Sequence, residues 1–205
     1  PFVPDRSTFG DVVRILERYE LVEECPESIL KHMRDGARGI IPETPKEGDE
    51  IFKRVRNVIV GSNILALHAG AQKAEELGYN TIVLSSSIEG DTAETAAVHG
   101  AIAREIRSTG NPVPTPPCVL SGGETTVVVK GDGKGGRNQE FALALVETVS
   151  RIPGCLILSA GTDGTDGPTD AAGAMVDETT LQRAEKMALD YRAFLNRNDS
   201  YNFFG

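Results

Sequence analysis

Residues 55–107 read VRNVIVGSNILALHAGAQKAEELGYNTIVLSSSIEGDTAETAAVHGAIAREIR, and in them short apolar runs alternate with helical patterns. The apolar runs Val55–Val60 and Thr81–Leu84 are rich in β-branched residues. Each run precedes a segment with helical spacing, Ile64–Leu77 after the first and Asp91–Arg107 after the second. Nearly continuous apolar strands that alternate with helices are typical of parallel sheets covered on both faces. This order predicts an α/β fold with parallel-sheet, Rossmann-like layers.

The same alternation starts again after a proline-rich stretch. Residues 110–117 hold four prolines, a composition typical of a linker between domains. Beyond them, the apolar runs Thr125–Lys130 and Cys155–Ala160 predict two strands, with a helix over residues 138–150 between them. We therefore expect a domain boundary after residue 112.

The composition excludes several classes of protein. The 205 residues include 21 Lys+Arg and 30 Asp+Glu, a formal net charge of −9, whereas binders of nucleic acid or anionic membranes need a basic face. No apolar run approaches the roughly 20 residues of a membrane-spanning helix. Cys25, Cys118 and Cys155 lie far apart and lack metal-ligand spacing, which favours free thiols in the reducing cytoplasm. We expect a cytoplasmic protein with no nucleic-acid or membrane partner, and the sequence leaves the oligomeric state open.

The glycine-rich segment GDGKGG, residues 131–136, satisfies the G-x-G-x-x-G pattern between a predicted strand and a predicted helix. The polar first helical turn, residues 137–140, departs from a dinucleotide fingerprint and favours a cradle for phosphate. Glycine amides approach a phosphate closely, the helix N-terminus adds positive potential, and the Arg137 guanidinium suits phosphoryl oxygens. A solvated glycine-rich loop is the alternative. The residues predicted to bind nucleotide phosphate here are Gly131, Gly133, Lys134, Gly135, Gly136 and Asn138.

A second polar loop follows the predicted strand that ends at Ala160. It reads GTDGTDGPTDAAG over residues 161–173 and lies where open α/β sheets bind ligands. Carboxylate and hydroxyl oxygens suit Mg²⁺ that is held jointly with substrate phosphates. Alternatively, these Asp and Thr side chains cap their own backbone. We predict Asp163 and Asp166 as magnesium ligands.

Two shorter turns carry a weaker signal of the same kind. The Ser62-Asn63 pair and the Ser121-Gly122-Gly123 segment each follow a predicted strand and could donate N–H groups to an anion, although such turns often only reverse the chain. His68 and His99 fall inside predicted helices, where we expect them to be packed or solvated. No Ser–His–Asp or Cys–His set can be argued from the sequence.

Several longer stretches together resemble a known family, the ATP-dependent D-glycerate kinases of the MOFRL class. The resemblance to its carboxyl-terminal domain rests on SGGETTV (121–127), GxGKGGRNQEFAL (131–143), SAGTDGTDGPTDAAGA (159–174) and NDSYNFF (198–204). The patterns PxVPDxSTFxD (1–11) and VGSNxxAL (60–67) resemble the end of the family's larger amino-terminal domain.

The resemblance implies two α/β domains and a cleft in which ATP, Mg²⁺ and D-glycerate meet to give ADP and phosphoglycerate, with 2-phosphoglycerate as the favoured product. Residues 1–112 would form the end of the large domain and residues 113–205 the smaller α/β, MOFRL-like domain. Arg137 and Asp163 match the family's functional positions and are expected to be catalytic, Asp163 as metal ligand or as acceptor of the glycerate hydroxyl proton.

The resemblance also implies a fragment, since the family's catalytic lysine belongs to an amino-terminal part outside this sequence and the extreme carboxyl terminus is expected to be missing. Two other functions stay open. One is an NAD(P)H-dependent hydroxypyruvate reductase that uses the 131–136 loop, and the other is a non-catalytic phosphate-binding module.

Overall fold

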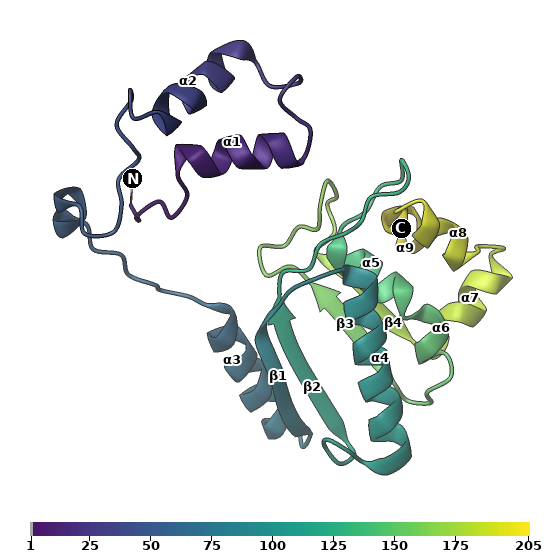
Figure 1. Cartoon of the computed structure of the whole chain (residues 1–205). Helices are drawn as coiled ribbons and strands as arrows, with labels where there is room; N and C mark the ends of the chain where they lie inside the picture. Colours follow the sequence, from purple (N-terminus) through teal and green to yellow (C-terminus); the bar gives the residue numbers. More distant parts are fainter. Residues whose placement is uncertain (1) are drawn as a thin grey trace. The chain divides into compact units, whose positions relative to one another are not determined.

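The computed structural model describes residues 2–205, which form two compact units. The first unit ends at Val60 and the second spans Gly61–Gly205 (Figure 1). The boundary that the proline-rich stretch suggests, after residue 112, remains a proposal.

The first unit is a small pair of helices. It contains α1 (Phe9–Arg18), α2 (Glu27–Ala37) and a short 3₁₀ helix, η1 (Glu50–Arg54). Thr8 and Asp11 form a reciprocal capping box at the start of α1, in which the Asp11 N–H donates to Thr8 Oγ1 over 3.1 Å. The Phe9 ring packs on α2, edge-on to the ring of His32 at 5.5 Å.

The predicted strand at residues 55–60 is wrong. These residues form no regular element, and their last three side chains are largely exposed, 66% for Val58, 84% for Ile59 and 92% for Val60. A strand is stable only when a neighbour pairs with its N–H and C=O groups. Within the described residues this run has no such neighbour, so its β-branched composition alone does not produce a strand.

The second unit contains a parallel pair of strands between two helices. The elements in chain order are α3 (Asn63–Glu76), β1 (Asn80–Ile88), α4 (Thr92–Thr109) and β2 (Pro117–Gly123). Strands β1 and β2 run parallel in a register that places Val83 opposite Leu120 and Ser85 opposite Ser121. Figure 1 shows α3 and α4 flanking this pair, which confirms the mixed α/β fold and its parallel sheet.

A second pair of strands follows. The next elements are α5 (Arg137–Ala144), α6 (Val146–Val149), β3 (Leu156–Ala160) and β4 (Gly173–Asp177). Strands β3 and β4 are antiparallel, an arrangement that the sequence pattern does not indicate. The predicted strand over residues 125–130 is also wrong, because only Thr126 pairs, in an isolated bridge to Asp91. Beyond this bridge the chain is held by the side chain of Asn198 rather than by another strand.

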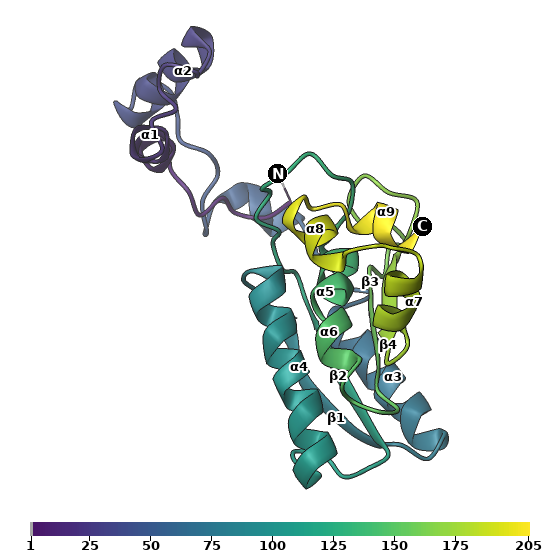
Figure 2. The ribbon, with the colours of Figure 1, turned by 90° about the vertical axis from the view of Figure 1, so that its right-hand side faces the viewer.

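The core lies around α5 and α6. Leu143, Val146 and Val149 are fully buried between the strands and the last helices, α7 (Thr180–Lys186), α8 (Tyr191–Asn196) and α9 (Ser200–Phe204). Gly100 of α4 allows close packing here, because a Cβ at this position would lie 2.9 Å from Leu145 Cδ2. Figure 2 shows α7, α8 and α9 gathered beside α5 and β4. None of the helices in the described part of the chain is long and apolar enough to span a membrane.

Candidate functional site

The carboxyl ends of β1 and β2 bring two of the predicted turns together. A Cβ on Gly122 would lie only 2.4 Å from the Asn63 side chain, so glycine is required for this approach. The Asn63 amide donates to the carbonyl oxygen of Ser86 at the end of β1 over 2.8 Å. Ser62 precedes α3 as its N-cap but makes no side-chain capping hydrogen bond. Asn63, Ser121 and Gly122 thus share the sheet edge at which parallel α/β sheets bind ligands, and Gly123 ends β2 beside them.

A Ser–His pair lies at the same edge, and the sequence analysis did not anticipate it. His99 projects from α4 and its Nε2 atom lies 2.8 Å from Ser121 Oγ. Its Nδ1 atom lies 2.8 Å from the carbonyl oxygen of Thr95, one helical turn earlier. The ring also packs edge-on to Phe141 of α5, with centroids 5.2 Å apart. Because the pair forms across 22 residues, no local spacing marks it in the sequence.

The predicted phosphate cradle is largely occupied by the protein itself. The Gly131 N–H donates to Asn198 Oδ1 over 3.1 Å, the Gly133 N–H to the Arg197 carbonyl oxygen over 2.9 Å, and the Lys134 N–H to Asp199 Oδ1 over 3.0 Å. These donors face the connection between α8 and α9. Three amides of the predicted cradle therefore serve to hold the chain's last helices, a role that the sequence analysis did not assign.

The glycines of this loop are needed for the same packing. A Cβ on Gly133 would lie 2.5 Å from the Arg197 carbonyl oxygen, and a Cβ on Gly135 would lie 2.2 Å from Ser200 Oγ. Real Cβ atoms do not approach other atoms so closely, so the G-x-G-x-x-G pattern has a structural cause independent of any ligand.

We expect Gly133→Ala to destabilise the protein by about 1–3 kcal/mol, the usual cost of forcing extra volume into a packed site. Gly61→Ala is the matched control, since a Cβ at Gly61 would meet no atom within 4 Å. Chemical denaturation measures both variants. Equal stability of the two would contradict the packing role.

The remaining part of the loop is open. Among the described residues, the N–H groups of Gly135, Gly136 and Arg137 have no protein acceptor. Arg137 is the first residue of α5, and its guanidinium makes one loose ion pair, 3.6 Å from Glu124 Oε1. Its side chain is 36% exposed. Arg137 therefore lies where a phosphoryl group could meet a guanidinium and free helix-terminal amides together.

Asp166 caps α5 from inside the protein. It is fully buried, and its two carboxylate oxygens accept four hydrogen bonds from the backbone and side-chain amides of Asn138 and Gln139, at 2.8–3.1 Å. Four hydrogen bonds use the full acceptor capacity of a carboxylate. The geometry therefore favours a capping role for Asp166 over the predicted magnesium role. Asn138 is equally fixed, because its Oδ1 atom accepts a hydrogen bond from Ser159 Oγ over 2.8 Å.

Asp163 has the opposite environment. It is exposed in the loop after β3 and accepts one long hydrogen bond, 3.3 Å, from the Thr165 N–H. No group of three or more His, Cys, Asp or Glu side chains in residues 2–205 could enclose a metal ion. Asp163 can therefore offer a single carboxylate to a cation whose other ligands come from phosphates and water, as Mg²⁺ often has.

Asn198 and Asp199, which the sequence analysis quotes only within the NDSYNFF motif and gives no role, hold these parts together. Asn198 donates from its Nδ2 atom to Glu140 Oε2 over 3.0 Å, while its Oδ1 atom accepts from the loop amides. Asp199 is buried and accepts the Lys134 N–H. Burial raises the pKa of the Glu140 carboxyl, partly offset by the hydrogen bond from Asn198. In the sequence, the only signal for these two residues was their place in the NDSYNFF motif.

Comparison with known proteins identifies similar sequences and structures. The model of the MOFRL family matches residues 117–205, which include β2, the glycine loop, Arg137 and the capping residue Asp166. This match covers less than half of the chain. The similarity to individual proteins extends beyond the matched residues to nearly the whole chain.

The glycerate 2-kinase of Pyrococcus horikoshii is 40% identical over 202 residues, which are 98% of this chain and 45% of that protein. The D-glycerate 2-kinase of Thermotoga maritima is 37% identical over the same share of this chain and 45% of its own length. The crystal structure of glycerate kinase from Thermotoga maritima superposes with a TM-score of 0.77, at 37% identity, over 98% of this chain and 45% of that one. The chain thus spans about half the length of these relatives.

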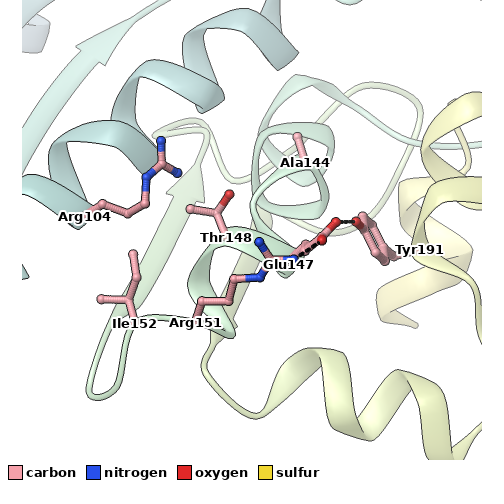
Figure 3. A pocket seen from close by; sticks show the side chains of 7 residues that line it. All are labelled: Arg104, Ala144, Glu147, Thr148, Arg151, Ile152 and Tyr191. Carbon is pink, nitrogen blue, oxygen red and sulfur yellow. Dashed lines mark hydrogen bonds and ion pairs between the residues drawn. The ribbon is translucent and has the colours of Figure 1, made fainter.

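One cavity of the second unit lies away from the predicted site residues. Figure 3 shows this cavity, of about 290 Å³, between α4 and the α5–α6 segment. Glu147 lies at its centre, where it accepts a hydrogen bond from the Tyr191 hydroxyl and pairs with Arg151 and Arg192. The residues that line it are Arg104, Ala144, Glu147, Thr148, Arg151, Ile152 and Tyr191.

The hydrogen bond from the Tyr191 hydroxyl to Glu147 predicts that the folded protein loses stability at alkaline pH. Burial of the Tyr191 phenol, together with its hydrogen bond to Glu147, raises the pKa of Tyr191 to about 12. The folded state thus favours the neutral phenol, so its stabilising effect is complete below the unfolded value of about 10 and is lost as the pH rises towards 12. We expect the melting temperature of Tyr191→Phe to fall less than that of the wild type over this range. Tyr79→Phe, which alters an exposed tyrosine, should follow the wild type, and parallel curves for all three proteins would contradict the prediction.

Proposed function

We propose that the protein, at the length of its relatives, transfers the γ-phosphoryl group of ATP to D-glycerate and releases ADP and 2-phosphoglycerate. The observation that carries this proposal is 37–40% identity along 98% of the chain to proteins named as glycerate 2-kinases. Residues 1–112 would be the end of the large domain and residues 113–205 the smaller one, in a cytoplasmic enzyme.

Arg137 is the residue best placed to bind the transferring phosphoryl group. Phosphoryl transfer requires positioning and neutralisation of charge more than covalent participation by the protein. The Arg137 guanidinium and the free amides at residues 135–137 offer both at one helix terminus. Lys134 adds a second cation nearby in the loop, with its Nζ atom 4.2 Å from the centre of the Tyr201 ring.

Magnesium fits this part of the chain only as an ion shared with ATP. Asp163 would supply one carboxylate ligand and the nucleotide phosphates would supply others. When bound, the ion would neutralise phosphate charge. Asp166 is not available for this purpose in the observed arrangement, because the amides of α5 occupy both of its oxygens.

The reductase alternative has less support. A dinucleotide fingerprint presents the glycine amides to the pyrophosphate, whereas three amides of this loop donate to residues 197–199.

Coupled ADP release by the full-length protein with ATP, Mg²⁺ and D-glycerate tests the proposal. Feeding the product directly to enolase, with and without phosphoglycerate mutase, distinguishes 2-phosphoglycerate from 3-phosphoglycerate. We expect ADP release to require glycerate. We also expect enolase to convert the product without added phosphoglycerate mutase. NADH oxidation with hydroxypyruvate would support the reductase instead. Binding of ATP without turnover would support a non-catalytic phosphate-binding module.

A further inference from the structure

The His99–Ser121 pair has no role in the binding of ATP or magnesium described above, yet its geometry is closely defined. The ring of His99 is fixed on three sides, by the Thr95 carbonyl oxygen, by Ser121 Oγ and by the Phe141 ring. These three contacts come from α4, β2 and α5, and none involves a charged group. No salt bridge within residues 2–205 includes His99. The imidazole is therefore oriented but not committed to a counter-ion.

The hydrogen bonds fix the direction in which the pair donates. A carbonyl oxygen only accepts, so the hydrogen on His99 must be at Nδ1, where it points to Thr95. In the neutral ring Nε2 then carries a lone pair and accepts the hydrogen of the Ser121 hydroxyl. Ser121 Oγ consequently offers lone pairs, rather than a hydrogen, to any group that approaches from the sheet edge. Such an atom suits a hydroxyl group better than a phosphate.

Enzymes usually activate an oxygen nucleophile by hydrogen-bonding its hydroxyl group to a base, and a third group fixes the orientation of that base. Here the reacting oxygen can be that of the substrate, since the proposed acceptor of the phosphoryl group is itself an alcohol. We propose that Ser121 accepts a hydrogen bond from the reacting hydroxyl of glycerate, and that His99 takes up the proton through Ser121. This inference rests on the proposed kinase function and assigns the substrate-hydroxyl subsite to the carboxyl end of β2.

The glycerate oxygen forms a bond to the γ-phosphorus while the bond between that phosphorus and the β,γ-bridging oxygen breaks, and ADP leaves with the electron pair. The glycerate hydroxyl proton moves to Ser121 Oγ as the Ser121 proton moves to His99 Nε2. The ring becomes imidazolium, stabilised by its Nδ1–H bond to Thr95, and later returns the proton to solvent. Asp163 is then left to interact with the cation.

The test compares Ser121→Ala, Ser121→Thr and His99→Gln in the full-length protein, with the rate of phosphoryl transfer measured in a single turnover. We expect Ser121→Ala and His99→Gln to slow this step by about 10²-fold, the usual lower range for removal of acid–base catalysis. Ser121→Thr keeps the hydroxyl and should restore most of the rate. The KM for ATP should change little in all three variants. Ser150→Ala and His68→Gln are matched controls, since Ser150 lies at the end of α6 and His68 is exposed on α3.

A solvent isotope measurement separates proton transfer from a purely structural role. The wild type moves two protons in one step, so its rate in mixtures of H₂O and D₂O should follow a curve, whereas Ser121→Ala should lose the curvature. A rate within about threefold of the wild type for Ser121→Ala, or an unchanged isotope dependence, would overturn the relay and leave the kinase function intact. A wild type without glycerate-dependent ADP release would instead overturn the proposed function, and the relay with it. If His99→Gln does not fold, the proposal is tested by comparing the single-turnover rates of Ser121→Ala and Ser121→Thr.

Discussion

Replacing Arg137 with alanine in the full-length protein should lower kcat by about 10²-fold or more while leaving the fold intact. A decrease of this size in kcat is usual when an enzyme loses one preorganised hydrogen-bond donor to the negative charge that develops in the transition state. The fold should tolerate the change because a cation at the first position of a helix is locally unfavourable, and because the pair with Glu124 is a loose surface contact at 3.6 Å. Coupled ADP release and thermal unfolding measure the two effects.

Two further variants make this result specific. Arg137→Lys keeps the charge but loses the planar fork, so its kcat should lie between those of the wild type and Arg137→Ala. Arg183→Ala removes an arginine from a comparable surface pair with Asp177 and should leave kcat unchanged. Near-normal turnover by Arg137→Ala would remove Arg137 from the mechanism.

Asp166→Ala should have the largest effect on stability, a loss of at least about 3 kcal/mol of unfolding free energy. The substitution removes a helix cap and leaves three amide nitrogens of Asn138 and Gln139 without an acceptor, while Gln139 Nε2 keeps its hydrogen bond to Thr169 Oγ1. Because Gln139 is itself only 1% exposed, water has little access to its freed groups. Urea denaturation of the full-length protein gives the value.

The matched control is Asp132→Ala, which removes an exposed aspartate from the neighbouring loop and should change stability by less than about 0.5 kcal/mol. Asp166→Asn should be intermediate, since one of its two terminal atoms can still accept. If Asp166→Ala kept normal stability and only weakened the magnesium dependence of turnover, the capping role would be wrong and the predicted metal role would return.

Local signals predicted the helices α3, α4 and α5 and the parallel strands. The capping residues Thr8 and Asp91 mark the first turns of α1 and α4, where their side chains accept N–H groups three residues ahead. The apolar runs at β1 and β2 are correctly placed, and the resemblance to glycerate kinases rested on motifs that the MOFRL match now covers. These features depend on residues close together in the chain, so the sequence shows them directly.

The errors have one physical cause. The runs at 55–60 and 125–130 have the composition of strands, but within the described residues no neighbouring strand forms a ladder with them. Strand β4 forms because it pairs with β3 in an antiparallel ladder. The packing role of the glycine loop was missed for a related reason, since a sequence lists amide donors but not their acceptors. Those acceptors, Asn198 and Asp199, lie more than 60 residues away.

The amino-acid sequence by itself determined the α/β class, the positions of α3, α4 and α5, and the resemblance to the MOFRL family, whose model matches residues 117–205. It also supplied Arg137 as the leading candidate residue. Only the tertiary structure distinguished Asp166 from Asp163, because burial and hydrogen bonding, not residue type, decide whether a carboxylate is free to bind. It alone joined His99 to Ser121, since the contact depends on how α4 packs beside the end of β2. Residue identity fixes what a group can do, and the packing of distant segments fixes what it is free to do.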